Sequence, residues 1–161
     1  MYIQAKCGDL IFVRSNHIGS KLIRWWTSSI FDHVEISLGN GKTIGARPRG
    51  GVQINDVKLI EAVNWCVAKP AIGLMDEQLA EIINFAKSQV NKKYDWLGVI
   101  GFVIDRNIND PNRWFCSEFV ERCFKHGKYP LIPRKSPSMT SPELIYQSWR
   151  VVPVSSNFIK I

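Results

Sequence analysis

No stretch of this 161-residue chain is apolar for long enough to cross a lipid bilayer. A membrane helix needs roughly 20 such residues, and the longest nearly uncharged run, Trp96 to Ile104, is much shorter. The first residues, Met1 to Asp9, contain neither the apolar run nor the small-residue cleavage site of a secretion signal. We therefore expect a protein that has no transmembrane segment and a cytoplasmic location.

The chain also has no low-complexity segment, internal repeat or long linker, so we expect one domain over residues 1–161. Its four cysteines form no Cys-x-x-Cys pair, and its three histidines are not paired as metal ligands. In a chain large enough to build its own core, such cysteines are typical of free thiols rather than of disulfides or zinc ligands. We expect no metal and no other cofactor.

The charge is unbalanced towards the basic side, because 21 Lys and Arg residues stand against 14 Asp and Glu residues, a formal charge of +7. Such a surplus makes nucleic acids, anionic polymers and membrane surfaces possible partners. The chain has no clustered basic run, no Gly-rich phosphate loop and no recognition-helix pattern. Nucleic-acid binding is therefore a third-ranked hypothesis, and no specific nucleic-acid partner is predicted.

The first half of the chain contains short apolar or alternating runs that predict strands. A short helix is expected between the first two of them, at Gly19 to Trp26. Asn40-Gly41 predicts a tight hairpin turn, because such a turn requires positive φ at both central residues. The expected strands are Asp9 to Arg14, His33 to Leu38, Lys42 to Arg47, Val52 to Asn55 and Ala62 to Lys69.

The second half changes to helical spacing. Asp76 is placed to cap a helix that ends near Asn91, and Tyr94 to Ile104 predicts a buried, irregular helix. Thr140-Ser-Pro-Glu143 has the spacing of a capping box with proline early in the helix, and Val151 to Val154 is a further strand candidate. Together the two halves predict an α+β fold, in which an antiparallel sheet packs against helices.

Cys116 lies on the first turn of a helix of about three turns that is predicted within Trp114 to Gly127. The inward face of this helix carries apolar residues at i, i+3, i+4, i+7 and i+8, and Gly127 is a fitting end. A thiol in the first turn of a helix is close to unsatisfied N–H donors and to the positive end of the dipole, which favour the thiolate. We therefore expect Cys116 to be reactive, and Cys7, Cys66 and Cys123 to be structural.

A nucleophilic thiol needs a base, and the chain has three histidines. His17 lies in a polar loop, and His126 lies at a helix C-terminus, where the dipole stabilises an imidazolium without any further role. His33 opens an apolar strand of the sheet that the Cys116 helix must cover. A sheet that carries histidine, packed on a helix that begins with cysteine, brings thiolate and imidazole within reach.

Six short motifs follow one another along the chain. They are Gly8-Asp-Leu-Ile-Phe-Val13, Phe31-Asp-His-Val-Glu-Ile36, Ile44-Gly-Ala46 followed by Gly51-Val52, Lys93-Tyr-Asp-Trp96, Trp114-Phe-Cys-Ser-Glu-Phe119 and Thr140-Ser-Pro-Glu-Leu144. In this order they resemble the circularly permuted papain-like proteins, the YiiX-like branch of the NlpC-type superfamily, which is related to lecithin:retinol acyltransferase. The resemblance implies a permuted papain-like fold, with His33 as the catalytic histidine and Cys116 as the nucleophile.

The third catalytic position departs from the family pattern. Relatives usually carry a polar residue, often Glu or His, on the strand after the histidine strand, in a segment similar to Ile-Glu-Ala. Here that segment reads Ile44-Gly45-Ala46. A two-residue turn places His33 on the side of Ile44 and Ala46, whereas a register shifted by one residue brings Gly45 and Arg47 to that side. Neither register supplies a carboxylate.

Glu35 offers a replacement, because it lies two residues along the strand from His33 and points to the same face, about 7 Å away at the backbone. Exposure to solvent is the alternative for Glu35. Asp32 and Gln53 are weaker candidates. Glu118 either complements the helix dipole or has the further role that the family's Cys-Ser-Glu pattern suggests.

These residues favour a cysteine-dependent hydrolase, in which His33 removes the Cys116 proton and the thiolate attacks an amide or ester carbonyl to give an acyl-enzyme. The resemblance implies substrates that range from peptide amides, peptidoglycan fragments included, to lipid acyl groups. Tyr94 and Trp114 are candidates for a substrate groove and Arg47 for a substrate carboxylate or phosphate, with burial in the core and a solvated turn as their alternatives. The competing hypotheses are a lipid acyltransferase or thioesterase, and a non-catalytic binding module on the same fold.

Overall fold

The computed structural model describes residues 3–15, 29–61, 64–95, 113–133 and 140–157. Within them, six strands form one sheet in the order β4-β3-β2-β1-β5-β8, and every neighbouring pair is antiparallel. The strands are β1 (Leu10–Arg14), β2 (His33–Gly39), β3 (Lys42–Arg47), β4 (Gly51–Asp56), β5 (Asn64–Pro70) and β8 (Val151–Ser156). Two short strands, β6 (Lys93–Tyr94) and β7 (Arg113–Trp114), form a second, parallel pair.

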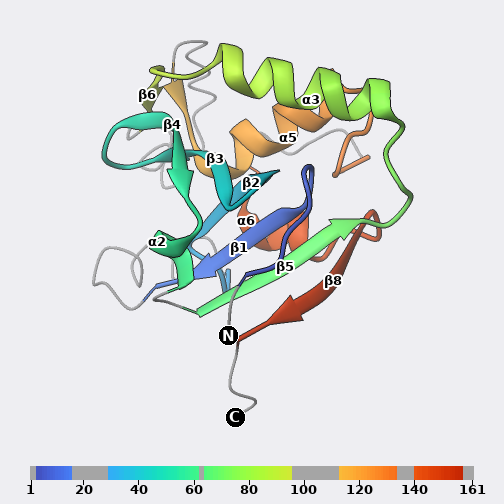
Figure 1. The fold of residues 1–161 in the computed structure, drawn as a ribbon, viewed down its shortest axis with the longest axis horizontal. Coiled ribbons are helices and arrows are strands. Elements are labelled where there is room, and N and C mark those ends of the chain that lie inside the picture. The colour runs from blue at the N-terminus through green and yellow to red at the C-terminus, as the bar shows by residue number, and fades with distance from the viewer. Residues whose placement is uncertain (1–2, 16–28, 62–63, 96–112, 134–139, 158–161) are drawn as a thin grey trace.

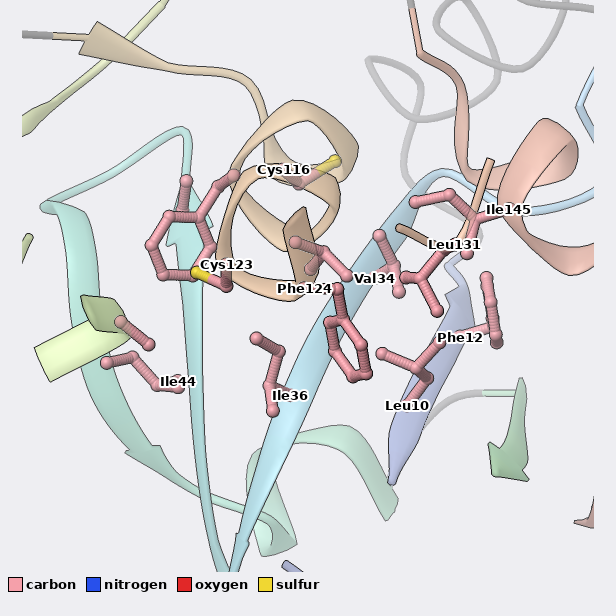
Figure 2. Close-up of a cluster of buried hydrophobic side chains, with 14 of the residues drawn as sticks. Leu10, Phe12, Val34, Ile36, Ile44, Cys116, Cys123, Phe124, Leu131 and Ile145 are labelled. Carbon is pink, nitrogen blue, oxygen red and sulfur yellow. The ribbon is translucent and has the colours of Figure 1, made fainter. Parts of the chain in front are cut away.

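Helices cover one face of the sheet. α3 (Asp76–Ser88) and α5 (Cys116–His126) pack side by side, and α6 (Pro142–Tyr146) contributes to the same layer (Figure 1). The large cluster of buried apolar side chains lies between these helices and the sheet and includes Phe12, Ile36 and Phe124 (Figure 2). The short α2 (Lys58–Glu61) contributes Ile60 to a smaller cluster around Trp65, which lies apart from the large one.

This architecture confirms the predicted α+β fold with its antiparallel sheet. All five strands expected in the first half are present, with ends that differ by at most two residues, and Val151 opens the edge strand β8. The helix expected at 19–26 lies outside the described residues, as does nearly all of the one expected at 94–104. The sequence interpretation included neither α2 nor the pairing of β6 with β7.

The hairpin between β2 and β3 sets the register around the histidine strand. Asn40 and Gly41 both have positive φ, 49° and 71°, as a tight two-residue turn requires. The pairing is irregular just before the turn, where Leu38 is an extra residue in β2. Because of this bulge the shifted one of the two expected registers forms, and Gly45 lies against Glu35.

The helix caps differ in detail from the predictions. α3 is capped at Met75, one residue before Asp76, and the Met75 N–H donates to the side chain of Gln78 at 3.2 Å. α6 is capped by Ser141 rather than by Thr140, and the Ser141 hydroxyl accepts a first-turn N–H at 3.2 Å. The next residue is proline, which has no N–H and fits the first helical position, so the cap falls on the residue before it.

The apolar stripe predicted for α5 is buried. Phe119, Val120, Cys123 and Phe124 have no exposed surface. The helix ends at Gly127, where a Cβ would lie 2.4 Å from the Ile82 side chain, so glycine allows α3 to approach α5 closely. Packing on the sheet and on α3 fixes the place of α5, and with it the place of the cysteine that begins it.

Candidate active site

Cys116 is the first residue of α5, in agreement with its predicted place in the first turn of that helix. The N–H of Phe119 donates to the carbonyl oxygen of Phe115 at 2.9 Å, which closes the first turn. No side chain of the described residues caps this end of the helix, so the first-turn N–H groups and the positive end of the dipole lie beside the thiol. The Cys116 side chain is fully buried and lies at the start of the helix, at one end of the apolar cluster (Figure 2).

Polar side chains of α5 tie the helix to the segments that follow it. The buried Ser117 hydroxyl donates to the carbonyl oxygen of Thr140. One turn further on, the Glu121 carboxylate accepts the N–H of Leu131 at 3.0 Å. Because each bond satisfies a group that is buried with its partner, breaking one costs about 1–3 kcal/mol. These bonds hold the helix in place next to the sheet.

His33 is the first residue of β2, and its backbone pairs with Val13 of β1. Its Nε2 lies 2.9 Å from Oε1 of Glu35, and 15% of its side chain is exposed. Burial lowers the pKa of His33, but hydrogen bonding to Cys116 and Glu35, and the negative charges of both, outweigh burial and raise the pKa to about 10. The imidazole therefore lies between the thiol and a carboxylate.

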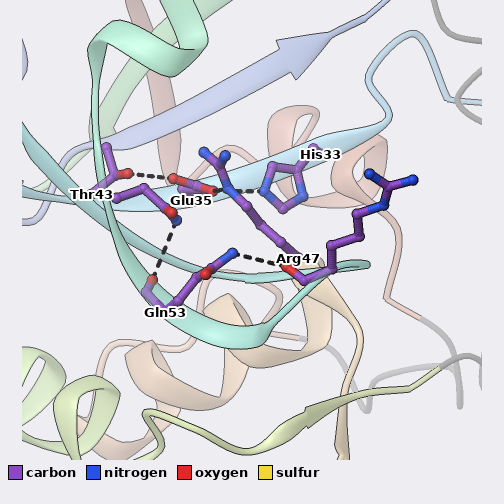
Figure 3. Close-up of polar contacts among 7 residues, drawn as sticks. His33, Glu35, Thr43, Arg47 and Gln53 are labelled. Atoms are coloured by element: carbon purple, nitrogen blue, oxygen red, sulfur yellow. Dashed lines mark hydrogen bonds and ion pairs between the residues drawn. The ribbon is translucent and has the colours of Figure 1, made fainter.

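Glu35 points inward and has no exposed surface. Its carboxylate contacts three side chains: Nε2 of His33, Oγ1 of Thr43 and Nε of Arg47, the last at 2.5 Å (Figure 3). Burial raises the pKa of Glu35, but the hydrogen bonds and charges of His33 and Arg47 outweigh burial and lower the pKa overall. Glu35 is therefore a buried anion with its partners beside it, so the solvent-exposed alternative is wrong.

Gly45 leaves the space that Glu35 occupies. A Cβ at position 45 would lie 2.6 Å from Cγ of Glu35 and 3.1 Å from Cδ, well inside the normal contact distance of about 3.5–4.0 Å between carbon atoms. The residue on β3 that departs from the family pattern, Gly45, therefore leaves room for a carboxylate that comes from Glu35 on β2.

The weaker candidates for the third position have other contacts. Asp32 accepts hydrogen bonds from the N–H and the hydroxyl of Ser15 at 2.7 and 2.5 Å. Gln53 donates to the carbonyl oxygen of Arg49 at 3.0 Å. Glu118 is half-buried on the first turn of α5, and burial raises its pKa. Among all the candidates for the third catalytic position, Glu35 is the residue whose carboxylate contacts the imidazole of His33.

Tyr94 and Trp114, the predicted groove residues, pair in β6 and β7 and are 5% and 6% exposed. Their rings pack against Phe115 and Phe119, with centroids 6.0 and 6.2 Å apart. Burial and then the charge of Cys116 raise the pKa of Tyr94. The indole N–H of Trp114 is buried and has no acceptor among the described residues. A part for either residue in substrate binding stays a prediction.

The remaining cysteines and histidines lie elsewhere. Cys66 and Cys123 are buried, Cys7 is exposed, and all four thiols are free. His126 lies in the last turn of α5, at the opposite end of the helix from the site. His17 lies outside the described residues.

Thr43 contacts Glu35 but was not among the predicted site residues. Thr43, Gly45 and Arg47 alternate along β3, so all three share the strand face that Glu35 meets. The alternation is visible in the sequence, but its alignment with Glu35 depends on the bulge at Leu38. Arg47, predicted as a substrate contact, lies on the carboxylate instead, and any contact with substrate stays a prediction.

Across the part of the chain that the structure describes, no three His, Cys, Asp or Glu side chains are grouped so as to hold a metal ion. Over the same residues, no helix has both the length and the apolar character needed to span a membrane.

The fold and the site together define a class of protein. A sheet with histidine at the start of one strand precedes, in the sequence, a helix that begins with cysteine, and the cysteine raises the pKa of the histidine. This is a papain-like arrangement with a permuted order of elements. Residues 4–148 match the model of the permuted papain-like amidase enzymes, YaeF/YiiX, C92 family, and the chain belongs to this family.

Two known proteins are similar to the chain. The probable lipoprotein peptidase YaeF of Escherichia coli (strain K12) is 23% identical over 172 residues, which cover 88% of this chain and 63% of that protein. The chain thus spans less than two thirds of the length of this relative. The crystal structure of the metalloprotein YiiX from Escherichia coli O157:H7 is 19% identical, with a TM-score of 0.75 over 98% of this chain and 100% of that one. This second likeness shows the shared fold.

Proposed function

We propose that this protein is a cysteine amidase in which Cys116 is the nucleophile, His33 the general base and Glu35 the carboxylate that orients the imidazole. The observation that carries the proposal is the position of His33 between the thiol and the carboxylate. An ionised carboxylate only accepts hydrogen bonds, so Nε2 is the donor in its 2.9 Å contact with Glu35. This bond orients the ring and leaves Nδ1 for the thiol.

Before acylation, Nδ1 of His33 takes the proton of Cys116, and the raised pKa of His33 favours the resulting thiolate–imidazolium pair. The sulfur then attacks the carbonyl carbon of an amide. The carbon–sulfur bond forms while the carbonyl π electrons move to the oxygen. The first-turn N–H groups of α5 are placed to bind this oxyanion. The imidazolium then gives its proton to the amide nitrogen, the carbon–nitrogen bond breaks, and the amine leaves.

In the deacylation step, neutral His33 takes a proton from water, and the hydroxide attacks the thioester. The carbon–sulfur bond breaks, a carboxylic acid leaves, and Cys116 recovers its proton from His33. Glu35 stays ionised in both steps and stabilises the imidazolium each time it forms. The net reaction is hydrolysis of an amide to an acid and an amine.

The substrate class we favour is a peptide amide, with peptidoglycan fragments among the candidates. Membership in a family of amidases supports the amide bond, and a relative described as a probable peptidase supports a peptide. Lipid acyl esters are the second candidate, because a thiolate attacks an ester carbonyl by the same steps.

The test compares hydrolysis of peptide p-nitroanilides and of acyl p-nitrophenyl esters by the wild type, Cys116→Ala and His33→Ala. Cys123→Ala is the matched thiol control, since Cys123 is equally buried on the same helix, and His126→Ala is the matched imidazole control. We expect amide hydrolysis to fall at least about 100-fold in the first two variants and to persist in both controls.

Other outcomes separate the alternatives. Hydrolysis that survives Cys116→Ala contradicts the proposal. A wild type that hydrolyses only the esters favours an acyl hydrolase. A wild type that hydrolyses neither, and whose Cys116 reacts with iodoacetamide no faster than Cys123, favours a non-catalytic binding module.

A further inference from the structure

Besides the imidazole of His33, the Glu35 carboxylate has two hydrogen-bond partners, and both lie on β3. Thr43 donates its hydroxyl to Oε2, and Arg47 donates Nε to Oε1 at 2.5 Å. His33 shares Oε1 with Arg47. Figure 3 shows Glu35 enclosed by these three side chains, with Thr43 on one side and His33 on the other. Both oxygens of a fully buried carboxylate are thereby occupied.

The two β3 partners differ in what they supply. The hydroxyl of Thr43 is a directional donor in a buried position, so it fixes the rotation of the carboxylate about its last bond. The guanidinium of Arg47 supplies a positive charge at hydrogen-bond distance. A guanidinium stays protonated at every pH at which such an enzyme works.

The permanent charge of Arg47 matters because the other positive charge next to Glu35, on the imidazolium of His33, is present only part of the time. The imidazole of His33 gains and loses a proton in each step of the proposed reaction, so its charge disappears whenever the proton passes to the leaving amine. A buried carboxylate without a positive partner is costly and tends to take up a proton. Arg47 is the partner that remains when His33 is neutral.

We propose that Arg47 and Thr43 are positioning residues, which keep Glu35 ionised and in one orientation while His33 changes its charge. Gly45 completes the arrangement, because the space beside it is where the Glu35 carboxylate lies. The proposal rests on the proposed function, since it assigns the two residues a part in orienting His33. It also gives Arg47 a role different from that of a substrate contact.

The experiment uses two matched pairs of variants on the full chain. Arg47→Met removes the charge and Arg47→Lys keeps it, while Thr43→Val removes the hydroxyl and Thr43→Ser keeps it. Arg49→Met is the control for a charge lost nearby, because Arg49 is exposed and lies two residues after Arg47, in the turn that follows β3. Each variant is titrated by ¹³C NMR at the Glu35 carboxyl carbon, assigned by its absence in Glu35→Gln, and kcat and KM are measured against pH on an amide that the wild type hydrolyses.

We expect Arg47→Met to raise the pKa of Glu35 by about 1–3 and to move the acid limb of the kcat profile up with it. We expect kcat to fall about 10- to 100-fold, the worth of one charge-assisted hydrogen bond, with KM little changed. Arg47→Lys restores most of the Glu35 titration, Thr43→Ser restores kcat relative to Thr43→Val, and Arg49→Met behaves as the wild type.

Two results overturn the proposal. One is a Glu35 titration that is the same in Arg47→Met and in the wild type. The other is a raised KM with unchanged kcat, which makes Arg47 a substrate contact. If the wild type hydrolyses no amide, the proposed function fails, and the Glu35 titration still decides whether Arg47 holds the carboxylate.

Discussion

Gly45→Ala adds one methyl group at a place that the Glu35 side chain already fills. The new Cβ would lie 2.6 Å from Cγ, 3.1 Å from Cδ and 3.2 Å from Oε1 of Glu35. Glu35 is fully buried, so either the two strands separate or the carboxylate leaves its place. Overpacking of this kind costs about 1–3 kcal/mol of folding free energy.

The effect on activity follows from the bond that is lost. A displaced carboxylate no longer accepts from Nε2 of His33, and a hydrogen bond to a charged group is worth about 1.5–3 kcal/mol. At about 1.4 kcal/mol for each factor of ten, we expect kcat to fall about 10- to 100-fold. Urea unfolding measures the first effect and steady-state kinetics on an amide the second.

Two controls show whether Glu35 is the cause. Gly73→Ala adds the same methyl group where nothing lies within 4 Å of the new Cβ, so we expect its stability to stay within about 0.5 kcal/mol of the wild type. In a Glu35→Ala background the space beside position 45 is empty, so Gly45→Ala should cost little or should stabilise the chain. An equal cost of Gly45→Ala in both backgrounds refutes the reasoning, because independent sites add.

Two further predictions concern stability. The pKa of Glu35 is lowered from 4.5 by its partners, so its contribution is present above about pH 4.5 and is lost as the pH falls through the lowered value. The difference in unfolding free energy between the wild type and Glu35→Gln, from urea melts, should therefore shrink on acidification, and a difference that grows contradicts this. Phe124→Ala, in the core on α5, should lower the free energy of unfolding by about 3–5 kcal/mol. Trp149→Ala, at a residue that is 66% exposed, should change it by no more than about 0.5 kcal/mol. Equal denaturation midpoints for the two variants contradict the assigned core.

The fold was predictable from local patterns because those patterns agree with the tertiary structure. The alternation from His33 to Leu38 and the Asn40-Gly41 turn together predict the hairpin, and both turn residues have the positive φ that the pair permits. The apolar stripe of the Cys116 helix predicts its start and its buried face, because burial needs one contiguous face.

The site was predictable only in part. The position of Glu35 two residues from His33 follows from the strand period alone, and the structure places the carboxylate on the imidazole. The partners on β3 depend on the register, which the bulge at Leu38 sets. Gly39 lies next to this bulge with a φ of 73°, and a glycine near the end of a strand does not by itself specify where the extra residue falls. The close contact between Gly45 and Glu35 is likewise a property of two strands rather than of one.

Aromatic residues show a different limit. Tyr94 and Trp114 were predicted as groove residues because they are aromatic, with burial in the core as the alternative, and both are buried among other rings. Large aromatic side chains occur both in cores and in substrate grooves, so the residue type does not distinguish the two places. Exposure is decided by what packs against the ring, which the sequence alone does not specify.

The reactivity of Cys116 relative to the other thiols is the most direct test of the catalytic assignment. Cys66 and Cys123 are also buried and Cys7 is exposed, so the chain contains its own controls for access. Alkylation with iodoacetamide near neutral pH, followed by peptide mapping, gives a rate for each thiol. We expect Cys116 to react faster than Cys66 and Cys123 in the wild type and to lose that advantage in His33→Ala. A Cys116 that reacts as slowly as Cys123, or as fast without His33 as with it, contradicts a Cys116–His33 nucleophile.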